Sequence, residues 1–158
     1  PQDRSSAASD VYKRQGYKES LKYNGIDFRK DLVFQANSDI ASGRKVARQI
    51  LSSDANIDAI FCSSDYIALG VMQELKEQNV SIPDDVAVVG FSNEPFTELL
   101  DLTLTSIEQS PYEMGKSAAR VFLDQMNSKN ANIEHAIKLK PKLCIRDSSL
   151  KNNRTMHK

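Results

Sequence analysis

This chain of 158 residues has no excess charge of either sign, because 21 Lys and Arg residues balance 21 Asp and Glu residues. Modules that bind nucleic acid usually carry a basic patch and an isoelectric point above about 9. With an isoelectric point near 7.2, the chain is not expected to bind duplex DNA by itself. No apolar run approaches the roughly 18 residues of a membrane span, so no membrane partner is expected.

Cysteine and histidine are scarce, with two residues of each. Cys62 and Cys144 lie in apolar stretches, which predicts buried, reduced thiols and favours a cytoplasmic location. His135 and His157 are isolated, and none of these residues has the spacing of metal ligands. The sequence also lacks a glycine-rich loop that could cradle phosphates. We therefore predict neither a metal site nor a cofactor.

Three short apolar segments are each followed by polar residues and then by a helix or a turn. They are residues 32–34, 59–62 and 86–89, and the first two lead into helical patterns at 40–51 and about 66–79. Apolar runs of this length are typical of strands covered on both faces of a parallel sheet. The carboxyl ends of such strands form the usual ligand site of open α/β sheets. The polar residues expected there are Ser38, Ser64, Asp65, Ser92, Asn93 and Glu94.

The predicted helices carry apolar stripes that can cover a sheet. Gly43, Val46, Ala47, Ile50 and Leu51 form one stripe, and Ala68, Leu69, Met72 and Leu75 form another. A third helix is predicted at 111–126, followed by two short strands at 136–139 and 143–145. The fold class predicted from this order is α/β, with a mostly parallel sheet and flanking helices.

Several ordered segments of the chain resemble the effector-binding core of the LacI/GalR family of bacterial transcriptional regulators. The segments that carry the resemblance are Gly16-Tyr17, Ser42-Gly43, Asp58-Ala59-Ile60-Phe61, Ser64-Asp65, Ala68-Leu69-Gly70, Ile82-Pro83-Asp84-Asp85-Val86-Ala87-Val88-Val89-Gly90-Phe91, Leu104-Thr105-Ser106-Ile107-Glu108-Gln109, Met114-Gly115 and Leu143-Cys144-Ile145-Arg146-Asp147-Ser148. The resemblance implies a periplasmic-binding-protein-like fold of type I, in which two lobes bind a small molecule, often a sugar, between them.

The resemblance also implies an incomplete core: much of the second lobe and the crossover segments that return to the first. We expect three parts: a non-native scar at 1–15, a partial effector-binding domain at 16–149 and a disordered tail at 150–158. The scar is inferred from the letters DVYKRQ at 10–15, which look like the translation of a sequencing-library adapter. The family's usual effector-binding Arg would fall at Lys13, so we carry over no contact there.

The resemblance gives the candidate binding residues different weights. In the family, the residue at Ser64 often faces the effector, whereas Ser92 stands where an Asp often binds sugar hydroxyls. Asn93 or Glu94 can compensate for that lost acceptor, and Gln109 near the crossover is a weaker candidate, as is Tyr112. The alternative for Ser38, Ser64 and Asp65 is a purely structural role as helix N-caps, which Ser and Asp often fill.

The function predicted is a small-molecule sensor, with a sugar as the expected effector, that also contributes to a homodimer. The resemblance implies that the parent protein binds operator DNA through a headpiece absent from this chain. It also implies that residues 66–72 and 96–102 make dimer contacts, for which the alternative is ordinary core and surface packing. The first alternative is the sugar-binding receptor of a transport system, since the fold alone does not assign function. A remote alternative is a serine hydrolase with Ser92, Asp101 or Asp124, and His135, which Pro95 disfavours.

Overall fold

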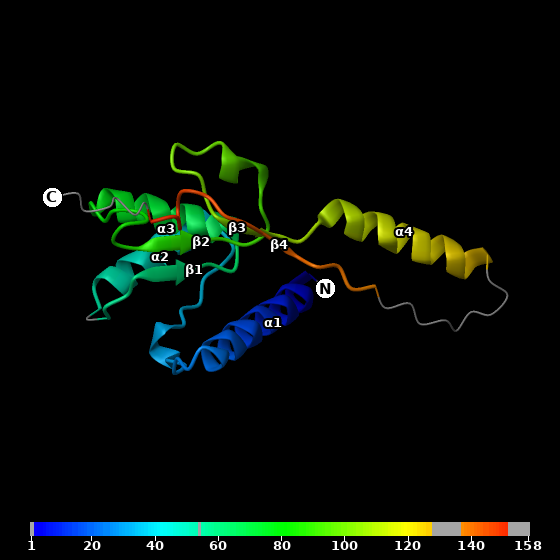
Figure 1. Cartoon of the computed structure of the whole chain (residues 1–158), viewed down its shortest axis with the longest axis horizontal. Coiled ribbons are helices and arrows are strands. Elements are labelled where there is room, and N and C mark those ends of the chain that lie inside the picture. Colours follow the sequence, from blue (N-terminus) through cyan, green and yellow to red (C-terminus); the bar gives the residue numbers. More distant parts are fainter. Residues whose placement is uncertain (1, 54, 128–136, 152–158) are drawn as a thin grey trace.

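The computed structural model describes residues 2–53, 55–127 and 137–151. Figure 1 shows a body of helices and short strands, from which the helix at 111–127 extends away. The elements, in chain order, are α1 (Gln2–Tyr23), η1 (Lys30–Leu32), α2 (Ile40–Leu51), β1 (Ala59–Phe61), α3 (Asp65–Glu77), β2 (Ala87–Val89), η2 (Pro95–Glu98), β3 (Ser106–Glu108), α4 (Pro111–Asn127) and β4 (Lys142–Cys144).

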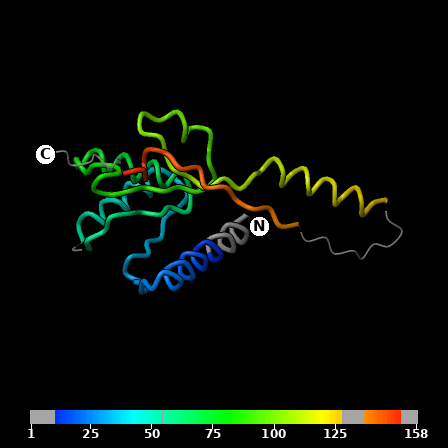
Figure 2. The backbone as a smooth tube through the Cα atoms, in the orientation of Figure 1, coloured from blue at the N-terminus to red at the C-terminus, as the bar shows by residue number. Residues whose placement is uncertain are grey.

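The strands lie side by side and bring the polar segments after β1 and β2 to one edge. β1 pairs with β2 in parallel, with Ile60 opposite Val88. A parallel bridge from Val89 to Thr105 leads to β3, which pairs antiparallel with β4. Figure 2 shows the segment that contains β4, coloured orange to red, returning beside the strands. The strands predicted at 59–62 and 86–89 and their parallel pairing are confirmed.

Helices α2 and α3 cross at two glycines, which allow the backbones to touch. A Cβ atom added at Gly43 would lie 2.2 Å from the carbonyl oxygen of Ile67, and one added at Gly70 would lie 2.1 Å from that of Ile40. Both helices turn their apolar stripes inward, as predicted, although Leu51 is exposed. The buried core they form with the strands comprises Ala47, Cys62, Ile67, Ala68, Val71, Met72, Leu75, Val86, Val88 and Leu104.

A buried carboxylate also joins the two helices. Glu74 of α3 receives hydrogen bonds from Arg48 at 2.8 and 2.9 Å, and Arg44 of α2 lies 3.1 Å away. The bonds from Arg48 hold the pKa of Glu74 at about 2, below its ordinary value. Since the folded state depresses this pKa, the pair stabilises the protein above about pH 4.5, and that contribution is lost as the pH falls toward 2.

Two of the predicted strands are wrong. Residues 32–34 end the 3-10 helix η1 and continue as irregular chain, and residues 137–139 are likewise outside any strand, residue 136 lying beyond the described residues. An apolar run becomes a strand only when its backbone pairs with a neighbour. Among the described residues, β1 pairs with β2 and β3 pairs with β4.

The apolar stripe predicted on the helix at 111–126 exists, but it does not enter the core. Helix α4 begins at Pro111, as expected, and has no buried residue; Phe122 is 61% and Met114 50% exposed. The described residues include no helix that is long and apolar enough to cross a lipid bilayer. The tail predicted at 150–158 falls outside the described residues from 152 onward.

Both cysteines are free, in agreement with the prediction of reduced thiols. Cys62 is buried at the end of β1, and Cys144 is partly buried in β4. Burial and, to a smaller extent, the nearby charge of Asp65 raise the pKa of the Cys62 thiol to about 12. Cys62 therefore remains protonated at neutral pH and acts as a small apolar core residue.

Candidate functional site

The candidate site is the edge of the sheet where the chain leaves β1 and β2. A backbone hydrogen bond of 3.1 Å from the amide of Asp65 to the carbonyl of Phe91 joins the two exits. Ser64 and Ser92 are therefore brought close in space, and both are partly exposed. Ser64 is the N-cap of α3, with its hydroxyl 3.3 Å from the amide of Tyr66. We call residues 92–94 the strand-end loop.

Asp65 binds the backbone of the strand-end loop from the protein interior and has no exposed surface. One of its carboxylate oxygens accepts a hydrogen bond of 2.8 Å from the amide of Glu94, and the other accepts one of 2.6 Å from the hydroxyl of Ser106. Gly90 lies against this carboxylate, since a Cβ added there would be 2.1 Å from Oδ1. Asp65 thus acts on the site through the loop, and it is Ser64 that caps α3.

The loop has a backbone that L residues rarely adopt. Ser92 has φ of 120° and Asn93 has φ of 55°. Positive φ values at residues other than glycine cost free energy and persist where surrounding contacts impose them. Here the amide of Ser92 donates to the carbonyl of Ile107 at 2.9 Å, and that of Asn93 donates to the hydroxyl of Ser106 at 3.0 Å. The loop is therefore preorganised by β3.

The remaining predicted residues fall into two groups. Gln109 lies beside the loop, with its amide nitrogen 3.5 Å from the hydroxyl of Ser92. Glu94, within the loop, is partly exposed. Ser38 is exposed, and Asp39 takes the N-cap position of α2 that was an alternative for Ser38. Tyr112 is 78% exposed on α4. The structure thus gathers Ser64, Asp65, Ser92, Asn93, Glu94 and Gln109.

Sequence reasoning missed two aromatic residues at this edge. Phe61 ends β1 and Phe91 follows β2, and their rings meet edge to face with centroids 6.5 Å apart. Phe61 is 42% exposed. Lys13 lies over the ring of Phe91 at 4.5 Å and donates to the carbonyl of Ser63 at 3.1 Å.

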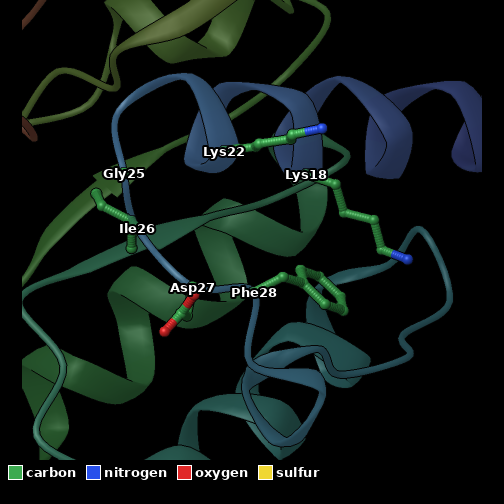
Figure 3. Close-up of a pocket in the computed structure, with 6 residues that line it drawn as sticks. All are labelled: Lys18, Lys22, Gly25, Ile26, Asp27 and Phe28. Atoms are coloured by element: carbon green, nitrogen blue, oxygen red, sulfur yellow. The ribbon is translucent and has the colours of Figure 1, made fainter.

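A hollow on another part of the structure contains none of these residues. It measures about 280 Å³ and is lined by Lys18, Lys22, Gly25, Ile26, Asp27 and Phe28. Figure 3 shows Lys18 extending from α1 alongside the ring of Phe28, and its ammonium lies 4.4 Å from the ring centroid. The described residues contain no group of three or more His, Cys, Asp or Glu side chains that could hold a metal ion.

Comparison with known proteins gives a consistent family. Residues 1–149 match the model of a periplasmic binding protein-like domain. The HTH-type transcriptional repressor CytR of Escherichia coli K12 is 34% identical over 119 residues, which are 75% of this chain and 35% of CytR. The chain therefore spans about a third of the length of this relative.

Two solved structures share the fold. The complex of the transcriptional regulator CelR with cellobiose matches with a TM-score of 0.78 and 28% identity, over 88% of this chain and 42% of CelR. A LacI family regulator from Lactobacillus casei with bound sucrose matches with a TM-score of 0.72 and 28% identity, over 85% of this chain and 50% of that one. The periplasmic-binding-protein-like fold predicted from the sequence is confirmed.

Proposed function

This chain belongs to the periplasmic-binding-protein-like domains that form the effector-binding region of LacI-type regulators. We propose that the edge of its sheet where β1 and β2 end is one wall of a sugar-binding site. The observation that carries the proposal is the meeting of Ser64, Ser92 and Gln109 beside the exits of two parallel strands. Ligands of open α/β sheets bind at such exits.

The chemistry of this wall supports a polyhydroxylated effector. Neutral hydroxyl and amide groups exchange hydrogen bonds with sugar hydroxyls, and the ring of Phe61, 42% exposed beside them, offers an apolar face. CelR and the Lactobacillus casei regulator were solved with cellobiose and sucrose, respectively. We further propose that the protein is a cytoplasmic regulator and has no enzymatic activity, because CytR and CelR are described as transcriptional regulators.

Three substitutions in the wall test the sugar site. Ser64→Ala should weaken sugar binding about two- to tenfold, since a neutral hydrogen bond contributes about 0.5–1.5 kcal/mol. Glu94→Gln should weaken it similarly or more, whereas Ser92→Asp should strengthen it about tenfold by adding a charged acceptor. The measurement is calorimetric titration with cellobiose and sucrose, in a protein that carries this chain at the full length of its relatives.

The matched control is Glu77→Gln at the far end of α3, where the carboxylate pairs with Arg44. It should leave the sugar affinity unchanged. Unchanged affinity in all three wall variants would place the binding site elsewhere. If neither sugar binds the parent protein, the alternative of a different effector class is favoured.

We also propose that α3 and η2 form a dimer face. The rings of Tyr66 and Phe96 pack with centroids 5.2 Å apart, and Leu99 next to them is 83% exposed. An aromatic pair beside an exposed leucine is the kind of surface that protein interfaces bury. The resemblance of residues 66–72 and 96–102 to dimer segments of the family supports this assignment.

Leu99→Asp should convert a dimer to a monomer, because a buried, unpaired carboxylate is costly at an interface. Sedimentation velocity over a range of concentrations measures the change. Leu123→Asp serves as control, since Leu123 is 55% exposed on α4, outside this face. Dissociation by Leu123→Asp with no effect of Leu99→Asp would contradict the proposal.

A further inference from the structure

A single arginine reaches the strand-end loop from the C-terminal segment. Arg146 follows β4, and its side chain is only 13% exposed although it carries a full charge. Its backbone is anchored just before β3, since its amide donates to the hydroxyl of Thr105 at 2.7 Å and its carbonyl accepts from the same hydroxyl at 3.0 Å. The guanidinium is therefore delivered from a fixed position.

The guanidinium spans two parts of the structure. One of its nitrogens donates to the carbonyl of Leu104 at 2.7 Å and lies 3.3 Å from the hydroxyl of Thr97. The other donates to the side-chain oxygen of Asn93 at 2.8 Å and pairs with Glu98 of η2 at 2.5 Å. A planar fork of several donors suits this geometry, whereas the single ammonium of lysine cannot reach all of these acceptors.

We propose that Arg146 is a positioning residue for the strand-end loop: by holding Asn93 and Glu98 together, it couples the candidate effector wall to η2 of the candidate dimer face. Asn93 carries one of the two positive φ values of the loop, and its side-chain oxygen is engaged internally by hydrogen bonds from Arg146 at 2.8 Å and Thr97 at 3.4 Å. Asn93 then contributes to the site by shaping it. The role of the loop as an effector wall rests on the proposed function; the restraint on the loop does not.

The restraint can be measured on the chain without any ligand. Native-state amide exchange reads the opening of the loop through the amides of Asn93 and Glu94, which are bonded to Ser106 and Asp65. Asn93→Ala and Arg146→Lys should each accelerate exchange at these two amides about tenfold or more, with the amides in the middle of α3 unchanged. In the double variant the acceleration should fall short of the two single effects combined, because both variants remove the Arg146–Asn93 bond.

The control is Arg48→Lys, which alters a comparable arginine–carboxylate pair at Glu74 but lies on α2, outside the loop. It should leave the exchange of Asn93 and Glu94 unchanged relative to α3. If Arg146→Lys and Asn93→Ala accelerated exchange equally in the loop and in α3, Arg146 would contribute only to general stability and the proposal would be wrong. Fully additive effects in the double variant, or no acceleration in either single variant, would also overturn it. Failure of sugar binding would leave the exchange result intact, so the two proposals can fail independently.

Discussion

Gly70→Ala is expected to destabilise the protein by about 3 kcal/mol, in the upper range for overpacking a well-filled contact. The added methyl group would lie 2.1 Å from the backbone oxygen of Ile40, so α2 and α3 must separate to accommodate it. In an unobstructed helix the same substitution stabilises by about 1 kcal/mol, so the steric effect has to exceed that gain. Urea unfolding followed by circular dichroism gives the difference.

Two further glycines make this prediction specific. Gly43→Ala should have a similar effect, because its Cβ would lie 2.2 Å from the carbonyl oxygen of Ile67 on the other helix. Gly115→Ala is the control: it lies in α4 with no neighbouring atom within 4 Å of an added Cβ. It should be neutral or slightly stabilising. Equal stability of Gly70→Ala and Gly115→Ala would mean that α2 and α3 do not touch at Gly70.

Asp65→Ala is the second large effect expected, with a loss of about 3 kcal/mol in the free energy of unfolding, because buried groups left unpaired cost roughly 1–3 kcal/mol each. The substitution removes the acceptor for the amide of Glu94 and for the hydroxyl of Ser106. Asp65 has no exposed surface, so water does not readily replace the lost acceptor. The strand-end loop should also open, which faster amide exchange at Glu94 would report.

Asp39→Ala is the matched control, since Asp39 is also an aspartate at the start of a helix. Its carboxylate caps α2 by accepting from the amide of Ser42 at 2.7 Å, but it is exposed. Loss of an exposed N-cap costs about 1 kcal/mol, and exchange at Glu94 should not change. If Asp65→Ala behaved like Asp39→Ala in both measurements, Asp65 would be no more than a helix-terminal residue.

The elements predicted correctly are those whose pattern lies within a few consecutive residues. Helix α2 begins and ends at the predicted residues, and α3 does so within two. Their stripes repeat at the helical period, which is a local property. The strands predicted at 32–34 and 136–139 failed because strand formation depends on a partner far along the chain. Residues 32–34 are as apolar as 87–89, but of the two segments only 87–89 pair with another strand among the described residues.

The candidate site was predicted in part for the same reason. Strand-end polarity placed Ser64, Ser92 and Glu94 at one edge, since parallel strands end together. Ser106 and Arg146 belong to segments that carried the family resemblance, yet nothing in their local sequence indicated contact with residues 92–94. Ser106 is 13 residues from Asn93 along the chain, and Arg146 is 53 residues from it.

The amino-acid sequence by itself determined the α/β class and the edge of the sheet where polar groups collect, because periodicity and strand-end composition are read along the chain. The family was indicated by the ordered segments that resemble LacI/GalR regulators. Only the tertiary structure decided which of those groups are used internally. The sequence left Asp65 equally compatible with ligand binding or helix capping. In the structure its carboxylate accepts hydrogen bonds from the hydroxyl of Ser106 and the amide of Glu94. The physical reason is that a buried carboxylate must be paired, and its partners are set by how β3 packs against the exits of β1 and β2.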